Sequence, residues 1–475
     1  MKIYNTLSKQ KEGFRPLNAG KVSMYICGPT VYDRIHIGNL RAYLIPDVLR
    51  KFLEYSSFEV RQIKNITDVG HLMEDNVAQG DTGEDKIEKK ALAEKKTPAE
   101  IAGFYENYFH ETEKALNILP AHFFPRATAH IPQMLKIIQI LIDKGFAYEK
   151  NGNVFFDVTK FADYGKLSGN TLENLKVGAR LEEHPDKKNP WDFALWLKAP
   201  KEHIMKWDSP WSVGYPGWHI ECSAMSMEYL GDTIDIHTGG EDNIFPHHEA
   251  EIAQSESATG QKFVNYWLHI RHLLVDGEKM AKSKGNFYFL EDIEAKGYSP
   301  MELRLAILSS HYRSQMNFTW AVMEQAKTNF QKISEFVYNL KNIPISSEKD
   351  SLGNEVSKYT EKFEKAMDDD LNTPLALSVL YEMITETNKL IAENKLDTKQ
   401  AKNILAVWEK MNKVFGFVIE AKQDIPEEII KIAEERKTFR NNKDFEKSDK
   451  LRDKILEKGY AIEDLKNNEY LIKKQ

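Results

Sequence analysis

The chain has 475 residues, of which 41% are apolar and 29% charged, with a formal net charge of −7. This composition is typical of an ordinary soluble protein, and the length predicts more than one domain. No apolar run is as long as a membrane span, and the polar start MKIYNTLSKQKEGF is not a signal peptide. Two cysteines nearly 200 residues apart exclude a disulfide framework. We therefore expect a cytoplasmic protein that is not associated with a membrane.

The distribution of charge is uneven along the chain. The negative total argues mildly against a nucleic-acid partner, but such binding depends on local basic patches rather than on the total. Between Lys431 and Lys474 there are 13 Lys and Arg against 10 Asp and Glu, a net charge of +3. The sign of the charge thus reverses near the C-terminus, so a nucleic-acid partner is not excluded there.

The first part of the chain alternates strand-like and helix-like segments. Val22–Cys27 predicts a buried strand, Leu40–Tyr55 a helix that Pro46 should kink, and Glu59–Ile66 a second strand. This alternation predicts an α/β fold with a doubly wound parallel sheet of Rossmann type. Residues 74–116 are highly charged and are predicted to be helical.

The pattern changes over residues 126–210 and then returns. A predicted helix at Gln133–Gly145 is followed by short strand-like pieces such as Asn153–Val158 and by turn-rich sequence, which indicates an insertion. The α/β pattern resumes with a predicted strand at Thr233–His237 and a helix with Pro246 at its first position.

The remainder of the chain is predicted to be mainly helical. Residues from Met301 onward have helical periodicity, interrupted by a polar, turn-prone linker over 342–357. Periodicity returns over 359–417, and Pro426 marks a further boundary. The last segment predicts two helices separated near Asn441.

A candidate anion site lies in the stretch Met24–Asn39, which reads MYICGPTVYDRIHIGN. A strand that leads into a helix through a glycine-bearing turn directs backbone N–H groups and the helix dipole at a ligand above the sheet, and phosphate is the usual ligand. His36 and Asn39 flank the turn, and Gly38 permits close approach of a ligand to the backbone. A histidine in such a loop, taken alone, is more often incidental than catalytic.

A second motif, Lys279-Met-Ala-Lys-Ser, follows about 240 residues later. Lys279 and Lys282 lie in a loop bounded by glycines and can reach a polyanion held at the first site. An isolated pair with this spacing is better explained as a solvated basic loop. Together, the two motifs resemble the paired H-I-G-[HN] and K-M-[SA]-K-S signatures of the class I aminoacyl-tRNA synthetases, and the pair is much more specific than either half.

Four residues form a candidate metal site. His247 and Glu251 are four positions apart on a predicted helix and project from one face, which by itself usually means a surface hydrogen bond. Cys27 ends the first predicted strand and Cys222 precedes another, so both approach the carboxyl edge of the sheet. Two thiolates, an imidazole and a carboxylate can form a tetrahedral zinc site. The spacing alone favours the alternative of two buried structural cysteines.

Over nearly its full length the chain resembles the cysteine branch of the class I aminoacyl-tRNA synthetases. The matching stretches are YICGPTVYD with HIGN, KNITDVG, NILPAHFFPRAT, PGWHIECSAMS, DIHTGGEDNIFPHHEAEIAQSE, NYWLH, KMAKSKGNF, SSHYRSQMNF and MDDDLNTP. The resemblance implies one zinc ion per chain, held by Cys27, Cys222, His247 and Glu251. Zinc binds a substrate thiolate strongly, whereas a serine hydroxyl is a poorer ligand.

The resemblance also implies roles in the use of ATP with Mg²⁺. The residues expected to bind the nucleotide are Gly28, His36, Gly38, Asn39, Lys279, Lys282 and Ser283. Of these, His36, Lys279 and Lys282 would be catalytic, with the two lysines serving the departing pyrophosphate. The positions that match the surroundings of the amino acid and the adenylate are Thr67, Trp218, His237 and Asp242. Trp218 also fits a core residue, and Asp242 also fits a turn or a helix cap.

Two residues depart from the commoner signatures. Asn39 stands where H-I-G-H has its second histidine, which keeps a hydrogen-bonding group but removes a titratable one. Ala281 stands where K-M-S-K-S has its first serine, which removes one hydroxyl group. Because the lysines and His36 are retained, we expect these changes to tune the rate.

The resemblance gives each part of the chain an expected role. The expected parts are a first catalytic half (1–125), an inserted connective subdomain (126–210), a second catalytic half with the zinc site (211–270), the KMAKS loop and stem-contact region (271–341), a helical bundle (358–420) and an anticodon-binding domain (426–475). The expected partners are L-cysteine, ATP and tRNA(Cys), and we expect a monomer. An amphipathic, solvated helix pair is the alternative for the last segment.

Two other functions compete with cysteine ligation to tRNA. A relative that activates cysteine and transfers it to an aminosugar would resemble a synthetase cut short after its helical region, and the sequence to Gln475 argues against it. A non-catalytic tRNA-binding paralogue would be expected to have lost His36, a zinc ligand or one of the two lysines. All of these residues are retained.

Overall fold

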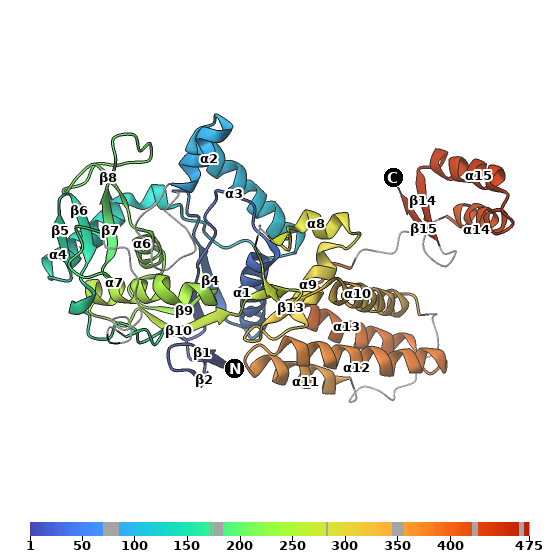
Figure 1. The fold of residues 1–475 in the computed structure, drawn as a ribbon. Coiled ribbons are helices and arrows are strands. Elements are labelled where there is room, and N and C mark those ends of the chain that lie inside the picture. The colour runs from blue at the N-terminus through green and yellow to red at the C-terminus, as the bar shows by residue number, and fades with distance from the viewer. Residues whose placement is uncertain are drawn as a thin grey trace. The chain divides into compact units, whose positions relative to one another are not determined.

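A computed structural model of the chain describes residues 1–69, 85–171, 173, 184–281, 284–343, 356–419, 426–464 and 470–474. The chain forms two compact units, Met1–Val418 and Ile419–Gln475 (Figure 1). Within the residues described, no helix has the length and apolar character needed to cross a membrane.

The centre of the first unit is a parallel sheet with the strand order β10-β9-β3-β4. Its strands are β3 (Lys21–Ile26), β4 (Glu59–Lys64), β9 (Ile234–Gly240) and β10 (Val264–Ile270). In the register of the central strands, Tyr25 lies between His237 and Ile63. The predicted parallel sheet is confirmed, and its two halves come from segments about 170 residues apart because the insertion separates them.

Helix α1 (Ile37–Tyr55) connects β3 to β4 and carries the candidate anion site at its first turn. Leu40, Leu44 and Val48 recur at helical spacing and are buried, which explains why this amphipathic segment packs as a helix. The helix runs through Pro46 without interruption and begins three residues before the predicted start. Helices α6 (Trp218–Leu230) and α7 (Glu249–Thr259) belong to the second half of the sheet domain.

The helix predicted to begin near Pro246 is present. Ile244–His248 forms an irregular helical turn that is kinked at Phe245, and α7 follows it directly from Glu249. Phe245 has an extended backbone with φ −139° and ψ 134°, because the ring of a following proline disfavours the helical conformation. His247 therefore lies in the turn and Glu251 in the helix, although the two side chains still face each other.

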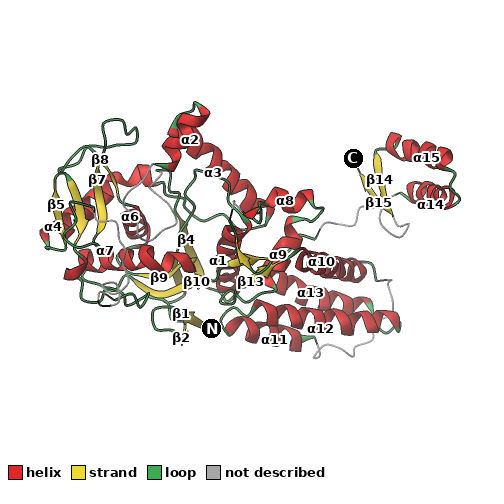
Figure 2. Cartoon of the chain, viewed as in Figure 1, coloured by secondary structure: helices red, strands yellow, loops and turns green. Residues whose placement is uncertain are grey.

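The insertion forms an antiparallel sheet with the order β5-β6-β7-β8 (Figure 2). Its strands are β5 (Ala147–Lys150), β6 (Asn153–Phe156), β7 (Phe193–Lys198) and β8 (Gly214–Pro216). Helix α4 (Ile131–Asp143) precedes it and buries Met134, Ile138 and Leu141 in the same apolar core as Ile220 and Met225 of α6. Two further helices, α2 (Lys86–Glu94) and α3 (Pro98–Ala115), follow the first half of the sheet.

A small three-stranded sheet carries the second signature motif. Strand β11 (Leu273–Val275) pairs with β12 (Glu278–Lys279) antiparallel and with β13 (Met316–Phe318) parallel. Helices α8 (Leu290–Ala295) and α9 (Pro300–Leu308) lie between β12 and β13 in the sequence, and α10 (Trp320–Lys341) follows β13. Lys282 and Ser283 lie outside the described residues.

The helical bundle consists of α11 (Ser357–Asp368), α12 (Thr373–Ala392) and α13 (Thr398–Phe415) (Figure 1). Buried polar contacts join it to the rest of this unit. The Arg304 guanidinium donates to the Phe415 carbonyl at 2.6 Å and contacts Asp47 of α1 at 2.8 Å. Asp370, fully buried, accepts from the Tyr4 amide at 2.7 Å, in the hairpin of β1 (Lys2–Asn5) and β2 (Gln10–Gly13).

The second unit contains two helices and a hairpin. Helices α14 (Glu427–Asn441) and α15 (Phe445–Glu457) match the predicted pair and its division near Asn441. Strands β14 (Tyr460–Asp464) and β15 (Tyr470–Lys474) pair antiparallel and were not predicted. The small core is apolar and consists of Ile429, Ile432, Ala433, Ile455, Ile462 and Ile472.

Candidate active site

The first turn of α1 is closed by a reciprocal pair of hydrogen bonds. His36 is the N-cap, and its Nδ1 accepts from the backbone amides of Gly38 (3.1 Å) and Asn39 (3.3 Å). In return, Asn39 Oδ1 accepts from the His36 amide at 3.2 Å. This is a capping box built from a histidine and an asparagine. Because Nδ1 is an acceptor, the hydrogen of the neutral ring is assigned to Nε2, where it can be donated to a ligand.

The two signature motifs meet at Gly38. A Cβ on Gly38 would lie 2.7 Å from Met280 Cε and 2.9 Å from His36 Cε1, so a larger residue would displace one of these side chains. The segment after the lysines also packs on this turn, since the Ile37 amide donates to the Tyr288 carbonyl at 3.0 Å and the His36 ring centroid lies 4.6 Å from that of Phe287. The structure thus brings together motifs separated by about 240 residues.

Lys279 is the described lysine of the second motif. It is exposed at the end of β12 and pairs in register with Leu274. Asn286 closes the loop after it, because its Oδ1 accepts from the Ala281 amide at 2.9 Å and its Nδ2 donates to the Lys279 carbonyl at 3.4 Å. The missing hydroxyl at Ala281 therefore leaves this loop closure intact.

Gly28 has a packing role at the end of β3. A Cβ there would lie 1.7 Å from the Asn65 carbonyl oxygen, and the Gly28 amide donates to Asn65 Oδ1 at 2.7 Å. The missing side chain is thus required by the neighbouring segment after β4. The predicted contact of Gly28 with nucleotide stays a prediction.

The four predicted metal ligands converge below the carboxyl edge of β3 and β9. Donor atoms of Cys222, His247 and Glu251 all lie within 4.8 Å of one another, and Cys27 Sγ lies 3.6 Å from His247 Nε2. His247 Nε2 is also 3.1 Å from Glu251 Oε1. Cys222, His247 and Glu251 are buried, whereas Cys27 is half-buried.

This donor set fits a zinc ion. Two thiols, an imidazole and a carboxylate are the ligands that tetrahedral zinc takes, and bonds of about 2.0–2.3 Å require donor atoms at the short mutual separations found here. Glu251 Oε1 is fully buried, and its nearest polar neighbour is another donor of the set, His247 Nε2, at 3.1 Å. Burial would raise the pKa of the Glu251 carboxyl, but His237 and His247 lower it to about 2, so the carboxylate is charged.

A second group of buried histidines surrounds the four ligands. His219 Nδ1 lies 3.0 Å from His247 Nδ1, which directs the other ring nitrogen of His247 at the thiols. His237 Nε2 lies 3.0 Å from Glu251 Oε2. His248 Nδ1 lies 2.8 Å from His269 Nε2, and burial lowers the pKa of both rings, to about 3 for His269.

Sequence analysis assigned no role to three of these histidines, His219, His248 and His269. Each belongs to a stretch that carried the resemblance, namely PGWHIECS, PHHE and NYWLH. These stretches contain four histidines together with a cysteine and glutamates, and this composition could have indicated a histidine-rich site. Periodicity could not show it, because the rings come from α6, the turn before α7 and β10.

Two of the four predicted substrate residues contact predicted metal ligands, and Thr67 contacts the residue next to Cys222. Thr67 Oγ1 donates to Glu221 Oε2 at 2.9 Å. The Trp218 ring centroid lies 4.4 Å from that of His247, and His237 contacts Glu251 as described. Asp242 is exposed in a short helical turn, Glu241–Asn243, where its carboxylate occupies the position that a Cβ on Gly240 would need. No contact joins Asp242 to the other three among the described residues.

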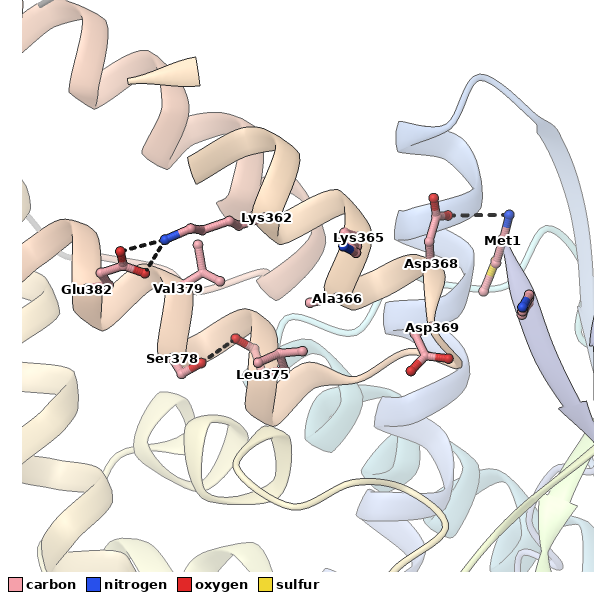
Figure 3. Close-up of a pocket in the computed structure, with 11 residues that line it drawn as sticks. Met1, Lys362, Lys365, Ala366, Asp368, Asp369, Leu375, Ser378, Val379 and Glu382 are labelled. Carbon is pink, nitrogen blue, oxygen red and sulfur yellow. Dashed lines mark hydrogen bonds and ion pairs between the residues drawn. The ribbon is translucent and has the colours of Figure 1, made fainter. Parts of the chain in front are cut away.

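A cavity of about 750 Å³ lies elsewhere in the first unit, between the chain start and α11–α12 (Figure 3). It is lined by charges of both signs, including Lys362, which pairs with Glu382 at 2.6 Å, and Asp368, which pairs with the Met1 amino group at 3.5 Å. None of the predicted site residues lines it. Its paired charges leave no single sign to attract a charged substrate.

A Rossmann-type sheet with the two signature motifs joined at the start of α1 defines a class I aminoacyl-tRNA synthetase. Residues 13–328 match the family model for the class I (C) tRNA synthetase catalytic domain, and residues 362–420 match the DALR domain. The fold resembles the Mycobacterium tuberculosis methionyl-tRNA synthetase solved with methionyl-adenylate, with a TM-score of 0.61, 15% identity, and coverage of 83% of this chain and 90% of that chain.

Full-length relatives define the branch. The chain is 43% identical to the cysteine–tRNA ligase of Chlorobaculum tepidum, over 100% of this chain and 99% of the relative. It is 42% identical to that of Thermus thermophilus (98% and 97% covered) and 45% identical to that of Caldicellulosiruptor saccharolyticus (98% and 98%). The chain belongs to the cysteine–tRNA ligase family.

Proposed function

We propose that the chain ligates L-cysteine to tRNA(Cys) through cysteinyl-adenylate, with a zinc ion at Cys27, Cys222, His247 and Glu251 selecting the thiol of the substrate. The observation that supports the zinc assignment is the convergence of these four donors, three of them buried. When bound, zinc supplies affinity for sulfur and lowers the pKa of a thiol.

The zinc-site residues select cysteine in this proposal. A pocket that relies on shape separates side chains differing by one small group by only about 10–200-fold. Cys222, His247 and Glu251 are buried, and His219 and His237 hold the last two, which supports a preorganised donor set. Cys27 is half-buried and is the most exposed of the four donors. Thr67 and Trp218 would line the space around the amino acid.

The other end of the site handles ATP. The cysteine carboxylate oxygen forms a bond to the α-phosphorus, and the bond from that phosphorus to the pyrophosphate oxygen breaks. The first turn of α1 directs its dipole, and His36 its Nε2–H, toward the phosphates. Lys279, Lys282 and Mg²⁺ neutralise charge on the departing pyrophosphate. The enzyme thus acts mainly by positioning and electrostatic stabilisation.

The second unit, Ile419–Gln475, would contact tRNA, and we propose that the ligase is a cytoplasmic monomer. An aminosugar ligase needs no such separate unit, so this unit favours tRNA as the acceptor. The decisive experiment is a charging assay with total tRNA and labelled cysteine, with zinc content measured on the same preparation. Acylation of tRNA(Cys) and about one zinc per chain are expected. Transfer of cysteine to an aminosugar but not to tRNA would refute the proposal.

A further inference from the structure

Arg41 of α1 is a fully buried arginine whose guanidinium contacts only main-chain oxygens. Its Nη1 donates to the carbonyls of Arg271 (2.6 Å) and His272 (3.2 Å), and its Nη2 to those of His311 (2.9 Å) and Ser314 (2.7 Å). Among the described residues no carboxylate lies within ion-pair distance of it, and its Nε has no partner. A buried charge with neutral partners is costly, so a structural or functional requirement must maintain it.

The four carbonyls belong to two loops that lead into strands of the same small sheet. The loop at Arg271 and His272 leads from β10 into β11, and the loop at 311–314 leads into β13. Strand β11 pairs with both β13 and β12, and β12 ends at Lys279. Arg41 therefore holds the loops that lead into β11 and β13, two strands of the small sheet. The edge strand β12 of that sheet carries Lys279.

The helix that carries Arg41 also carries the other half of the phosphate site. Arg41 lies three residues after Gly38, one turn from the end of α1 where His36 caps the helix. A single guanidinium thus links the first turn of α1 to the sheet of Lys279 through rigid secondary structure. Glu241 holds the same loop from the other side, accepting from the His272 amide at 2.7 Å.

We propose that Arg41 is a positioning residue for adenylate formation, which fixes the sheet of Lys279 relative to the His36 end of α1. This inference rests on the proposed function. Burial lowers the pKa of Arg41 to about 10, with the charge of Glu241 opposing, so the group remains charged at neutral pH. Lysine cannot replace it, because one ammonium cannot reach the four carbonyls that a planar fork with five donors serves.

Arg41→Lys tests the proposal, with Arg50→Lys as the matched control. Arg50 lies on the same helix and is also largely buried, but it donates to Gln62 and to the Pro120 carbonyl, away from the small sheet. In cysteine-dependent ATP–pyrophosphate exchange we expect Arg41→Lys to lower kcat by about 10–10²-fold, the size of an effect of misplacing a catalytic group. KM for cysteine and zinc content should stay within twofold of wild type, because Arg41 contacts no metal ligand.

A second measurement separates positioning from a loss of folding. In amide hydrogen exchange, Arg41→Lys should accelerate exchange locally over β11 and β13, whereas Arg50→Lys should not. The Arg41→Ala variant should regain ATP–pyrophosphate exchange activity when ethylguanidinium is added, but not when ethylammonium is added. Unchanged kcat in Arg41→Lys, an equal loss in Arg50→Lys, or uniformly faster hydrogen exchange would each overturn the inference. If the wild-type protein shows no cysteine-dependent ATP–pyrophosphate exchange, the proposed function is refuted instead.

Discussion

The proposed amino-acid end and the proposed phosphate end of the site are built in different ways. At the amino-acid end, the predicted metal ligands are mostly buried, and two of them are held by other side chains, His247 by His219 and Glu251 by His237. At the phosphate end, Lys279 is exposed on a two-residue strand, where its main chain pairs with Leu274 and accepts from Asn286 Nδ2. Selection between similar side chains requires fixed donors, whereas neutralising pyrophosphate requires charges that remain accessible to solvent and ligand.

The metal end should show the largest effect of a single change. Cys222→Ser removes a thiolate from a buried donor set, so we expect zinc per chain to fall below one tenth and kcat/KM for cysteine to fall by more than ~10²-fold, beyond the loss typical of changes around a metal site. Metal analysis and pyrophosphate exchange on one preparation provide the measurement. Ser226→Ala, a buried position on the same helix, is the control and should retain both. Full exchange activity in metal-free protein would contradict the zinc assignment.

Substitutions at the phosphate end should lower kcat and leave the zinc content unchanged. Lys279→Ala and Lys282→Ala should each lower kcat by about 10²–10³-fold, because each removes a charge that stabilises the departing pyrophosphate in the transition state. Lys284→Ala, which removes an exposed lysine of the same loop paired with Glu278 at 2.8 Å, should leave kcat nearly unchanged. An effect confined to KM would show that the lysines bind ground state and transition state equally.

The same contrast explains what the sequence could predict. Motifs that are contiguous, such as HIGN and the strand before it, predicted β3 and α1 with small errors at the ends. The phosphate site at their junction stays a prediction. The metal ligands were predicted only through family resemblance, because Cys27, Cys222 and His247 come from separate elements that no local pattern connects. Pro246 was a useful signal, since the proline keeps Phe245 extended and the chain is helical after that residue. The carbonyl contacts of Arg41 had no sequence signal at all, because main-chain acceptors carry no residue identity.

Removal of the second unit should leave both ends of the site unchanged. A chain ending at Asp424 retains every described residue of the proposed site, so cysteine-dependent exchange should stay within twofold of the full chain. Charging of tRNA should fall by about tenfold or more at low salt, and it should depend less steeply on salt than charging by the full chain, because fewer Lys and Arg contacts with phosphates release fewer counterions. Anticodon substitutions should then have almost no effect. Equal charging with the same anticodon preference would exclude a recognition role for this unit.

The smallest effects should come from the two departures in the signature motifs. Ala281→Ser adds a hydroxyl to a loop that Asn286 already closes, so its kcat should change by no more than a few-fold. The Ala281 amide donates to Asn286 in either case. A change of more than about tenfold would mean that the hydroxyl contacts ATP directly.

Asn39 allows the capping role to be separated from any contact with phosphate. Asn39→Ala removes the acceptor for the His36 amide, which should cost about 1 kcal/mol of folding free energy and lower the rate by about fivefold or less. Asn39→Asp keeps an acceptor at the helix N-terminus and should retain stability, but it places a negative charge beside the phosphates. Denaturant melts and exchange kinetics on both variants give the comparison. We expect the Asn39→Ala variant to show the larger loss of stability and the Asn39→Asp variant to show the larger decrease in kcat. If both variants lost stability and rate in the same proportion, Asn39 would act only through the fold of the first turn, and the phosphate end would be as preorganised as the metal end.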